Sequence, residues 1–339
     1  MKVSKPRSSS RVVVTSWKAK LNLRGTGWAE NGNLRYADAA QQRIMNDAAP
    51  TSAGSQGLLR GSSGASIWGR GYGQWTNVDG DPEATGYSQN SGGVVGGVDF
   101  AVSDNAIVGG AFAWGTSSVD FDTPHDHGDV NSFQFGGYGS YGFGRFYADG
   151  QLSFAFHDVT TTRELDLGFD TFIAAANYNA RSWTIAGEVG TVFKLGHVNM
   201  QPMLDVNYTG TSTNGFIESG AGSFGLVVGD TNADSLTTQL GMRASGVWTV
   251  GSTKLVPDLS LAWRHEFADD RQNFTAAFLE DPTTLFQVVS SSISPDSAVV
   301  SAGMTAGVSK GLELFVDYNG IINSDANSHN GSAGFRATW

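Results

Sequence analysis

RFYADGQLSFAFH, at residues 145–157, alternates apolar and polar side chains. One face carries Phe146, Ala148, Gly150, Leu152, Phe154 and Phe156, and the other carries Tyr147, Asp149, Gln151, Ser153 and His157. A period of two residues is that of a β-strand, whose successive side chains point to opposite faces. The stretch therefore predicts a strand with one apolar face and one polar face.

The same alternation recurs along most of the chain. Clear examples are VNMQPMLDVNY (198–208), LVPDLSLAWRHEF (255–267), LELFVDYNG (312–320) and GSAGFRATW (331–339). About twelve such segments are predicted, near 66–79, 88–101, 106–121, 129–143, 145–165, 172–192, 196–213, 232–249, 253–268, 294–309, 311–323 and 328–339. Short turns, as at 103–105 and 143–144, alternate with longer connections, as at 80–86 and 268–293. An even strand count with short turns at one end and long loops at the other is typical of outer-membrane barrels.

The composition narrows the class of protein. The 339 residues include 45 Gly, 8 Pro and no Cys, with 16% charged and 11% aromatic residues, which is unlike a disordered chain. The absence of cysteine excludes disulfides and thiolate metal sites, and a formal charge of −11 argues against a nucleic-acid partner. No apolar run approaches the ~20 residues of a membrane-spanning helix. The chain is therefore either soluble or a closed membrane barrel.

Segment length and aromatic placement favour the barrel over a soluble β-sandwich. Many segments run beyond the ~9 to 11 residues needed to cross a bilayer, whereas sandwich strands average about five to six residues. Aromatic residues gather at segment ends, among them Tyr141, Phe143, Trp248, Trp263 and Trp339. Such girdles mark the two membrane interfaces. The prediction is an all-β, 12-stranded antiparallel transmembrane β-barrel.

Charged residues on the polar faces are expected to line a hydrated lumen. They are Arg70, Asp149, Glu188, Asp205, Arg243, Arg264, Glu266, Asp317 and Arg336. In a functional interpretation they line the pore and grip a segment inside it. In a structural interpretation they form mutual salt bridges that satisfy a wet interior.

A helix is expected ahead of the barrel, in NLRYADAAQQRIMND (33–47). Asn33 is a suitable N-cap, apolar residues recur at near-helical spacing, and Pro50 follows as a stop. A small surface helix is the alternative interpretation. A Ser/Gly-rich linker, TSAGSQGLLRGSSGA (51–65), separates it from the first strand. At the start of the chain the apolar run Val12 to Val14 is too short for a signal-peptide core.

Several stretches together resemble the C-terminal translocator domain of autotransporters, the type V secretion β-barrel. They are SIWGRGYGQW, GGVVGGVDFAVSDNAIVGGAFAWGTSSVDF, QPMLDVNYTGTSTNGFIESGAG, SLTTQLGMRAS, LVPDLSLAWRHEF and the terminal GFRATW. The resemblance covers about 60–339. It implies a monomeric twelve-stranded barrel in the bacterial outer membrane, with the helix threaded through its lumen. Three parts are then expected: a tail or passenger remnant at 1–29, a linker with the lumen helix at 30–65, and the barrel at 66–339.

The resemblance also implies partners. These are outer-membrane lipid and lipopolysaccharide, periplasmic chaperones, the protein's own passenger and the barrel-assembly machinery, which would read the terminal signal of Phe335 and Trp339.

Two features depart from the family pattern. Fewer than thirty residues precede the helix, so the passenger is expected to be truncated, absent or encoded elsewhere, and the chain lacks the Asn-Asn pair at which a subset of the family cleaves. Asn46-Asp47 is a chemically labile bond rather than a cleavage site.

Two other functions stay open, an outer-membrane lipid or ester hydrolase and a passive porin-like channel. His157, His197, His265 and His329 lie on separate segments, and none has a local Ser/His/acid motif. His125 and His127 lie among three Asp residues in DTPHDHGD, but a solvated loop is favoured over a cation site. The GRGYG glycines (69–73) precede no helix, so they do not form a phosphate loop. The leading hypothesis is a non-enzymatic outer-membrane translocator without a cofactor.

Overall fold

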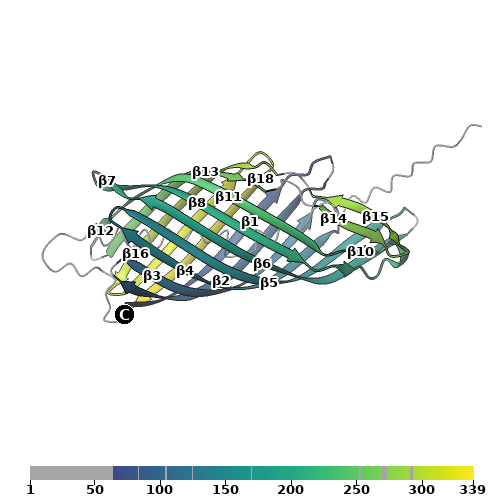
Figure 1. Cartoon of the computed structure of the whole chain (residues 1–339), viewed down its shortest axis with the longest axis horizontal. Coiled ribbons are helices and arrows are strands. Elements are labelled where there is room, and N and C mark those ends of the chain that lie inside the picture. The colour runs from purple at the N-terminus through teal and green to yellow at the C-terminus, as the bar shows by residue number, and fades with distance from the viewer. Residues whose placement is uncertain are drawn as a thin grey trace, which may run out of the picture.

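A computed structural model describes residues 64–339 except 83, 104, 124, 169, 252, 269–272 and 291–292. The predicted helix at 33–47, the tail and nearly all of the linker lie outside the described residues. The alternating segments form one closed antiparallel β-barrel (Figure 1). In the described part of the chain, no helix is long and apolar enough to cross a membrane.

Twelve long strands build the barrel wall within the described ranges. They are β1 (Ala65–Val78), β2 (Tyr87–Ser103), β3 (Ala106–Phe121), β4 (His127–Phe143), β5 (Phe146–Asp166), β6 (Thr171–Thr191), β8 (Val198–Thr213), β11 (Thr231–Gly246), β13 (Thr253–Glu266), β16 (Asp296–Ser309), β17 (Leu312–Ile322) and β18 (Ala326–Thr338). Two short strands, β7 (Phe193–Leu195) and β12 (Trp248–Val250), extend the sheet at one end. Each long strand coincides with one predicted segment to within a few residues, which confirms the strand count.

The barrel closes where its first strand meets its last. β1 pairs with β18 in an unbroken antiparallel register from Ser66 opposite Thr338 to Val78 opposite Ala326. Beyond the strand, the Trp339 backbone N–H donates to the Ala65 carbonyl oxygen at 3.2 Å. A closed sheet has no edge, so the backbone groups of every long strand find partners inside the hydrocarbon layer.

The burial pattern shows which face of each strand points inward. In β5 the polar residues Asp149, Gln151 and His157 are buried, whereas Leu152 and Phe156 are 44% and 49% exposed. Polar side chains inside and apolar side chains outside is the reverse of a soluble protein and matches a barrel surrounded by lipid. A sandwich would bury its apolar faces against each other, so the sandwich alternative is wrong.

The two ends of the barrel differ. The short turns, the start of β1 and the C-terminus lie at one end, together with β7 and β12 (Figure 1). The long connections lie at the other end, which by the asymmetry of outer-membrane barrels faces the cell exterior.

The exterior end carries a second sheet that the sequence analysis did not predict. Its order is β15 (Asp281–Val289), β14 (Asn273–Phe278), β10 (Leu226–Val228) and β9 (Phe216–Ile217), with a short 3₁₀ helix, η2 (Gly222–Phe224), between β9 and β10. The connection expected at 268–293 therefore contains a β-hairpin. The two strands of this hairpin have six and nine residues, NFTAAF and DPTTLFQVV, and lack the regular polar and apolar alternation that revealed the barrel. We call these four strands the exterior sheet.

Gly334 lies where the strands that close the barrel pack so tightly that a larger residue would not fit. A Cβ atom added at Gly334 of β18 would stand 2.5 Å from Cζ of Phe315 and would also overlap the Gly69 carbonyl oxygen. Gly334 faces the interior, whereas its neighbour Ala333 is exposed on the lipid side. Only the absence of a side chain lets β1, β17 and β18 approach at this level.

We expect Gly334→Val to impair barrel closure, because overpacking a fitted interior costs about 1–3 kcal/mol. The measurement is the fraction of protein with heat-modifiable migration in membranes from cells expressing the variant. Ala333→Val is the matched control, since it places the same valine side chain on the lipid face of the same strand. Equal folded fractions for the two variants would contradict the assigned facing of β18.

Candidate functional site

The predicted lumen residues lie on the inward face of the wall. Six of them, Arg70, Asp149, Glu188, Asp205, Arg243 and Arg336, are more than nine-tenths buried. Arg264, Glu266 and Asp317 are partly exposed on the same face. The alternation in sequence thus places these side chains on one surface, although they come from eight different strands.

Three carboxylates form a row across neighbouring strands, which we call the acidic row. Asp149 of β5 is directly opposite Glu188 of β6, and Glu188 is directly opposite Asp205 of β8. All three are at most 7% exposed. Like charges placed directly opposite each other destabilise a sheet, and burial adds to that cost. The arrangement therefore calls for hydrogen-bond donors and positive charge from outside these three strands.

Uncharged side chains supply part of the hydrogen bonding that these carboxylates require. The Tyr147 hydroxyl donates to Oε1 of Glu188 at 2.5 Å, and Nε2 of Gln201 donates to the Tyr147 oxygen at 2.5 Å. All three side chains are less than 2% exposed. Sequence reasoning placed Tyr147 on the polar face but gave it no role. Its partners lie 41 and 54 residues away along the chain, so only the strand register reveals them.

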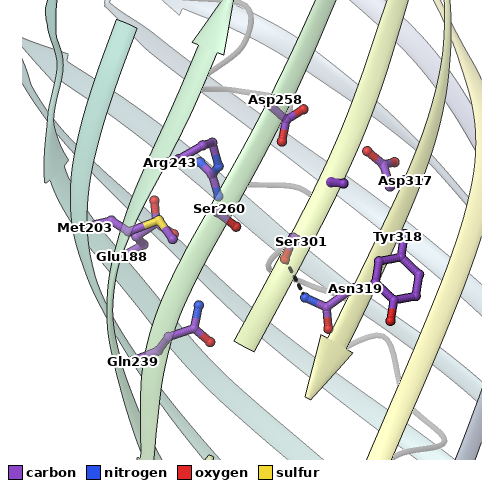
Figure 2. A pocket seen from close by; sticks show the side chains of 11 residues that line it. Glu188, Met203, Gln239, Arg243, Asp258, Ser260, Ser301, Asp317, Tyr318 and Asn319 are labelled. Carbon is purple, nitrogen blue, oxygen red and sulfur yellow. Dashed lines mark hydrogen bonds between the residues drawn. The ribbon is translucent and has the colours of Figure 1, made fainter. Parts of the chain in front are cut away.

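Cationic residues continue the wall beside the acidic row. Asp205 is opposite Gln239 of β11, which is in turn opposite Arg264 of β13. Arg243 lies four residues further along β11 and points into the same small pocket as Glu188 and Asp258, as Figure 2 shows. Among the described residues, Nη1 of Arg243 and Oδ2 of Asp205 have no hydrogen-bond partner. This part of the wall therefore keeps one guanidinium donor and one carboxylate acceptor that no described residue occupies.

Two ion pairs cross the strands on the other part of the wall. Nη2 of Arg70 lies 3.5 Å from Oδ2 of Asp317, and the Arg70 guanidinium stacks 4.8 Å above the Phe315 ring centre. Nη2 of Arg336 lies 3.6 Å from Oδ2 of Asp99. These contacts match the structural interpretation of mutual salt bridging.

Asp99 and Asp258 are lumen carboxylates that the sequence analysis did not select. Asp99 also accepts a hydrogen bond from the Tyr138 hydroxyl at 2.8 Å. Asp258 and Asp317 lean toward each other over Gly303, where an added Cβ atom would stand 2.5 Å and 2.8 Å from their respective Oδ1 atoms. Both residues follow the inward period of strands already identified, so extending that period would have found them.

Glu266 forms its hydrogen bonds at the exterior rim of the barrel and does not belong to the acidic row. Its carboxylate accepts hydrogen bonds from the Ser235 hydroxyl at 2.5 Å and from the backbone N–H groups of Leu236 and Ala268 at 2.8 and 3.1 Å. These bonds tie the exterior end of β13 to β11.

The histidines do not assemble a hydrolytic or metal centre in the described part of the chain. His157 lies between two serines, with Nδ1 2.8 Å from the Ser132 hydroxyl and Nε2 3.0 Å from the Ser182 hydroxyl. Both ring nitrogens are thus occupied by hydroxyls, whereas a hydrolytic triad uses one of them for an orienting acid. Nδ1 of His125 lies 3.0 Å from Glu164. Among the described residues, no group of three or more metal-binding side chains forms.

Comparison with known proteins agrees with this geometry. The sequence model of the autotransporter β-domain matches residues 67–319, which is most of the chain. The chain belongs to the autotransporter β-domain family. Its barrel is therefore an outer-membrane translocator domain, and it resides in the bacterial outer membrane.

Solved structures of autotransporter domains share the fold. The translocator domain of NalP from Neisseria meningitidis has a TM-score of 0.65 at 11% identity, over 93% of this chain and all of that chain. The β-domain of the Bordetella autotransporter BrkA has a TM-score of 0.62 at 20% identity, over 81% of this chain and all of that one.

Curated relatives include an extracellular serine protease of Serratia marcescens. It is 26% identical over 274 residues, which is 80% of this chain but 26% of the relative. The autotransporter β-domain described here thus spans about a quarter of the length of the curated relatives it matches.

We expect Tyr147→Phe to destabilise the autotransporter barrel, because the buried Glu188 and Gln201 would each lose a partner. An unsatisfied buried polar group costs about 1–3 kcal/mol. The measurement is the urea midpoint for loss of the fast-migrating folded form in detergent. Tyr141→Phe is the matched control, since Tyr141 is 53% exposed on the lipid face. If both variants unfolded at the same urea concentration, the hydroxyl of Tyr147 would not stabilise the acidic row.

Proposed function

We propose that this translocator domain anchors and exports a passenger segment that lies N-terminal to the barrel, and that the acidic row grips the predicted helix at 33–47. The observation that carries the proposal is the acidic row itself. Three directly opposed buried carboxylates are unfavourable alone and become favourable when a cationic segment lies beside them.

The polarity of the barrel supports export through the lumen. β1 begins at the short-turn end, beside the C-terminus, and runs toward the exterior end. A segment that precedes Ala65 therefore starts at the periplasmic end of the wall. To reach the outside as one continuous chain it has to cross the lumen.

The sequence of the predicted helix complements the lumen wall. It contains Arg35 and Arg43 among its polar residues, with Asp38 and Asp47 available for the basic side of the wall. In this proposal the arginines face the acidic row and the aspartates face Arg243 and Arg264. Charge pairs in a confined, partly dehydrated lumen are stronger than on a free surface. They would hold the helix as a plug.

The proposed role is transport and anchoring rather than catalysis. The Serratia relative is an extracellular serine protease, and most of its length lies outside the matched region. We propose that any such activity in an autotransporter of this type belongs to the passenger.

We expect the double variant Glu188→Gln, Asp205→Asn to loosen the plug and to raise the single-channel conductance of the purified protein in planar bilayers. Replacing two carboxyl groups of the acidic row by amides weakens its attraction for the predicted helix. Deletion of residues 30–50 should raise conductance further. Asp158→Asn is the control, because Asp158 lies on the exposed outer face of β5 and is not part of the lumen.

A passive porin-like channel has an open lumen and therefore predicts no change in conductance when residues 30–50 are deleted. If deletion of residues 30–50 left conductance unchanged, the lumen would not be plugged by this segment and the proposal would fail. Conductance that rose in Asp158→Asn as much as in the double variant would remove the specific role of the acidic row.

We further propose that Phe335 and Trp339 present the terminal signal to the barrel-assembly machinery. Phe335 is 43% exposed and Trp339 is 55% exposed, both toward the lipid side. The other proposed partners are periplasmic chaperones during transit, and lipid and lipopolysaccharide around the finished wall. The proposed division of the chain remains a tail at 1–29, a linker with the helix at 30–65 and the barrel from 66 onward.

We expect deletion of Trp339 to lower the amount of heat-modifiable protein in the outer membrane, because assembly would lose its aromatic signal. Refolding of the purified variant into detergent should be nearly unchanged, since the thirteen residue pairs of β1 with β18 end at Thr338 and are kept when the Trp339 N–H bond to the Ala65 carbonyl oxygen is lost. Equal losses in cells and in detergent would instead indicate that Trp339 stabilises the finished barrel.

A further inference from the structure

We propose that the lipid face of β11, β13 and β16 binds one acyl chain of lipid A, the membrane anchor of lipopolysaccharide. The site is an apolar groove on the outside of the barrel that ends, toward the cell exterior, at the carboxylate of Asp296. This inference rests on one part of the proposed function, the lipopolysaccharide around the finished wall, and is independent of passenger export.

The groove lies across three neighbouring strands, β11, β13 and β16 (Figure 1). It has a volume of about 640 Å³, and its apolar lining includes Leu240, Met242, Leu261, Trp263 and Ala298. The four larger side chains are at least 37% exposed and follow the outward period of their strands. Sites of roughly 300–1,000 Å³ hold small molecules, so the groove has room for an acyl chain but not for a folded partner.

The hollow arises where a small residue lies between two large ones. Ala298 of β16 is opposite Trp263 of β13 on one side and opposite Ile322 of β17 on the other. Trp263 and Ile322 are 50% and 45% exposed on the lipid face, so their side chains rise above the methyl group between them. Ala302, four residues further along the same face, is again opposite a large side chain, that of Tyr318. β16 therefore gives the groove a low floor.

Asp296 closes the exterior end of the groove and belongs to its lining. Its Oδ1 accepts a hydrogen bond from Nε1 of Trp263 at 2.8 Å and lies 2.8 Å from Nδ1 of His265. Oδ2 takes part in neither contact, and the Asp296 side chain is 57% exposed. One carboxylate oxygen is thus held by the wall, while the other can accept a hydrogen bond from a ligand.

The partners of this carboxylate are themselves held in place. The imidazole of His265 packs edge-on against the ring of Phe267, with centroids 4.6 Å apart. The backbone N–H of Phe267 donates to the Leu236 carbonyl oxygen at 2.8 Å. The backbone N–H of Glu266 donates to the Pro295 carbonyl oxygen at 2.9 Å, so the exterior end of β13 is tied on both sides. An acceptor that is already positioned loses little freedom when a ligand binds.

The groove belongs to the part of the wall that lies in the outer leaflet. β16 begins at the exterior end, and the residues of β16 that line the groove are its first three, Asp296, Ser297 and Ala298. Trp263 has the interfacial position that is typical of an aromatic girdle. Because the outer leaflet of the bacterial outer membrane consists mainly of lipopolysaccharide, this is the lipid that meets the groove.

The chemistry of the polar end favours lipid A over a glycerophospholipid. An ionised carboxylate accepts hydrogen bonds and donates none, so the ligand has to bring an N–H or O–H group to the start of its chain. The acyl chains of lipid A are joined to glucosamine through amide as well as ester bonds, and they carry hydroxyl groups near that junction. A glycerophospholipid presents ester carbonyls at the same level, and these only accept. Asp296 therefore pairs with the amide or hydroxyl group of lipid A.

Native mass spectrometry of the purified full chain in detergent tests the proposal. The folded protein is titrated with lipid A and, separately, with phosphatidylglycerol, and the fraction that retains one lipid gives an apparent Kd for each. We expect the unmodified chain to bind lipid A about tenfold more tightly, because a hydrogen bond to a charged group is worth roughly that factor or more.

Two variants locate the site. Ala298→Phe fills the groove and should weaken retention of lipid A by roughly tenfold, as overpacking does in a fitted space. Asp296→Asn replaces the charged acceptor by an amide and should lower the preference for lipid A over phosphatidylglycerol several-fold. Heat-modifiable migration shows that each variant is folded before it is titrated.

Each variant has a matched control. Ala333→Phe adds the same ring to the lipid face of β18, away from the groove. Asp234→Asn changes a carboxylate on the exposed face of β11 that also accepts a hydrogen bond from an aromatic side chain, the Tyr208 hydroxyl at 2.9 Å. Both controls should retain lipid A as the unmodified chain does.

Three results would overturn the proposal. Equal retention of lipid A and phosphatidylglycerol by the unmodified chain would remove the lipopolysaccharide partner together with the site, and this comparison needs no variant to fold. A preference for lipid A that survives Ala298→Phe would keep the partner but reject the groove. Equal loss of lipid A in Ala333→Phe and Ala298→Phe would indicate an unspecific coat of lipid. The conductance test of the 30–50 deletion involves none of these residues, so export and lipid binding can fail separately.

Discussion

Closure of the sheet between β1 and β18 is the constraint on which the rest of the structure depends. In hydrocarbon each unpaired backbone group costs several kcal/mol, so a sheet that spans a membrane cannot leave an open edge. Thirteen residue pairs, from Ser66–Thr338 to Val78–Ala326, meet that requirement at the seam. Gly334 belongs to this seam, because a side chain there would hold β17, β18 and β1 apart. With the ring closed, each strand has one face for lipid and one for the interior.

Closure also explains the polar chemistry of the lumen. The interior face cannot be reached by lipid, so charged side chains are retained there if they find partners. The wall uses two solutions. Arg70 with Asp317 and Arg336 with Asp99 are paired within the wall, whereas the acidic row relies on Tyr147 and Gln201 and still concentrates negative charge. The first arrangement stabilises the barrel, and we propose that the second binds a cationic segment.

The sequence predicted the barrel well because its signal is local and repeated. Alternation within a strand such as 145–157 identifies the strand, its inward face and its lumen residues without knowledge of any neighbour. Contacts between strands are not local. The Tyr147–Glu188 hydrogen bond and the Arg163–Glu218 ion pair join residues 41 and 55 positions apart, and they depend on register. The exterior sheet was missed for another reason, since β9 and β10 have two and three residues and give no period to detect. Asp258 alternates in phase with Arg264 and Glu266 within 255–267, so consistent use of the inward period would have included it among the lumen residues.

The unequal lengths of the strands have a consequence for what the barrel mouth looks like from outside the cell. β5 and β6 have 21 residues each, whereas β17 has 11. At a common tilt of 45° these lengths correspond to walls of about 50 Å and about 26 Å, so a bilayer core of about 30 Å covers the short wall and leaves the tall one projecting. The rim is therefore slanted. A chain leaving the pore therefore has a projecting wall on the side of β5 and β6 and a rim near the membrane surface on the side of β17.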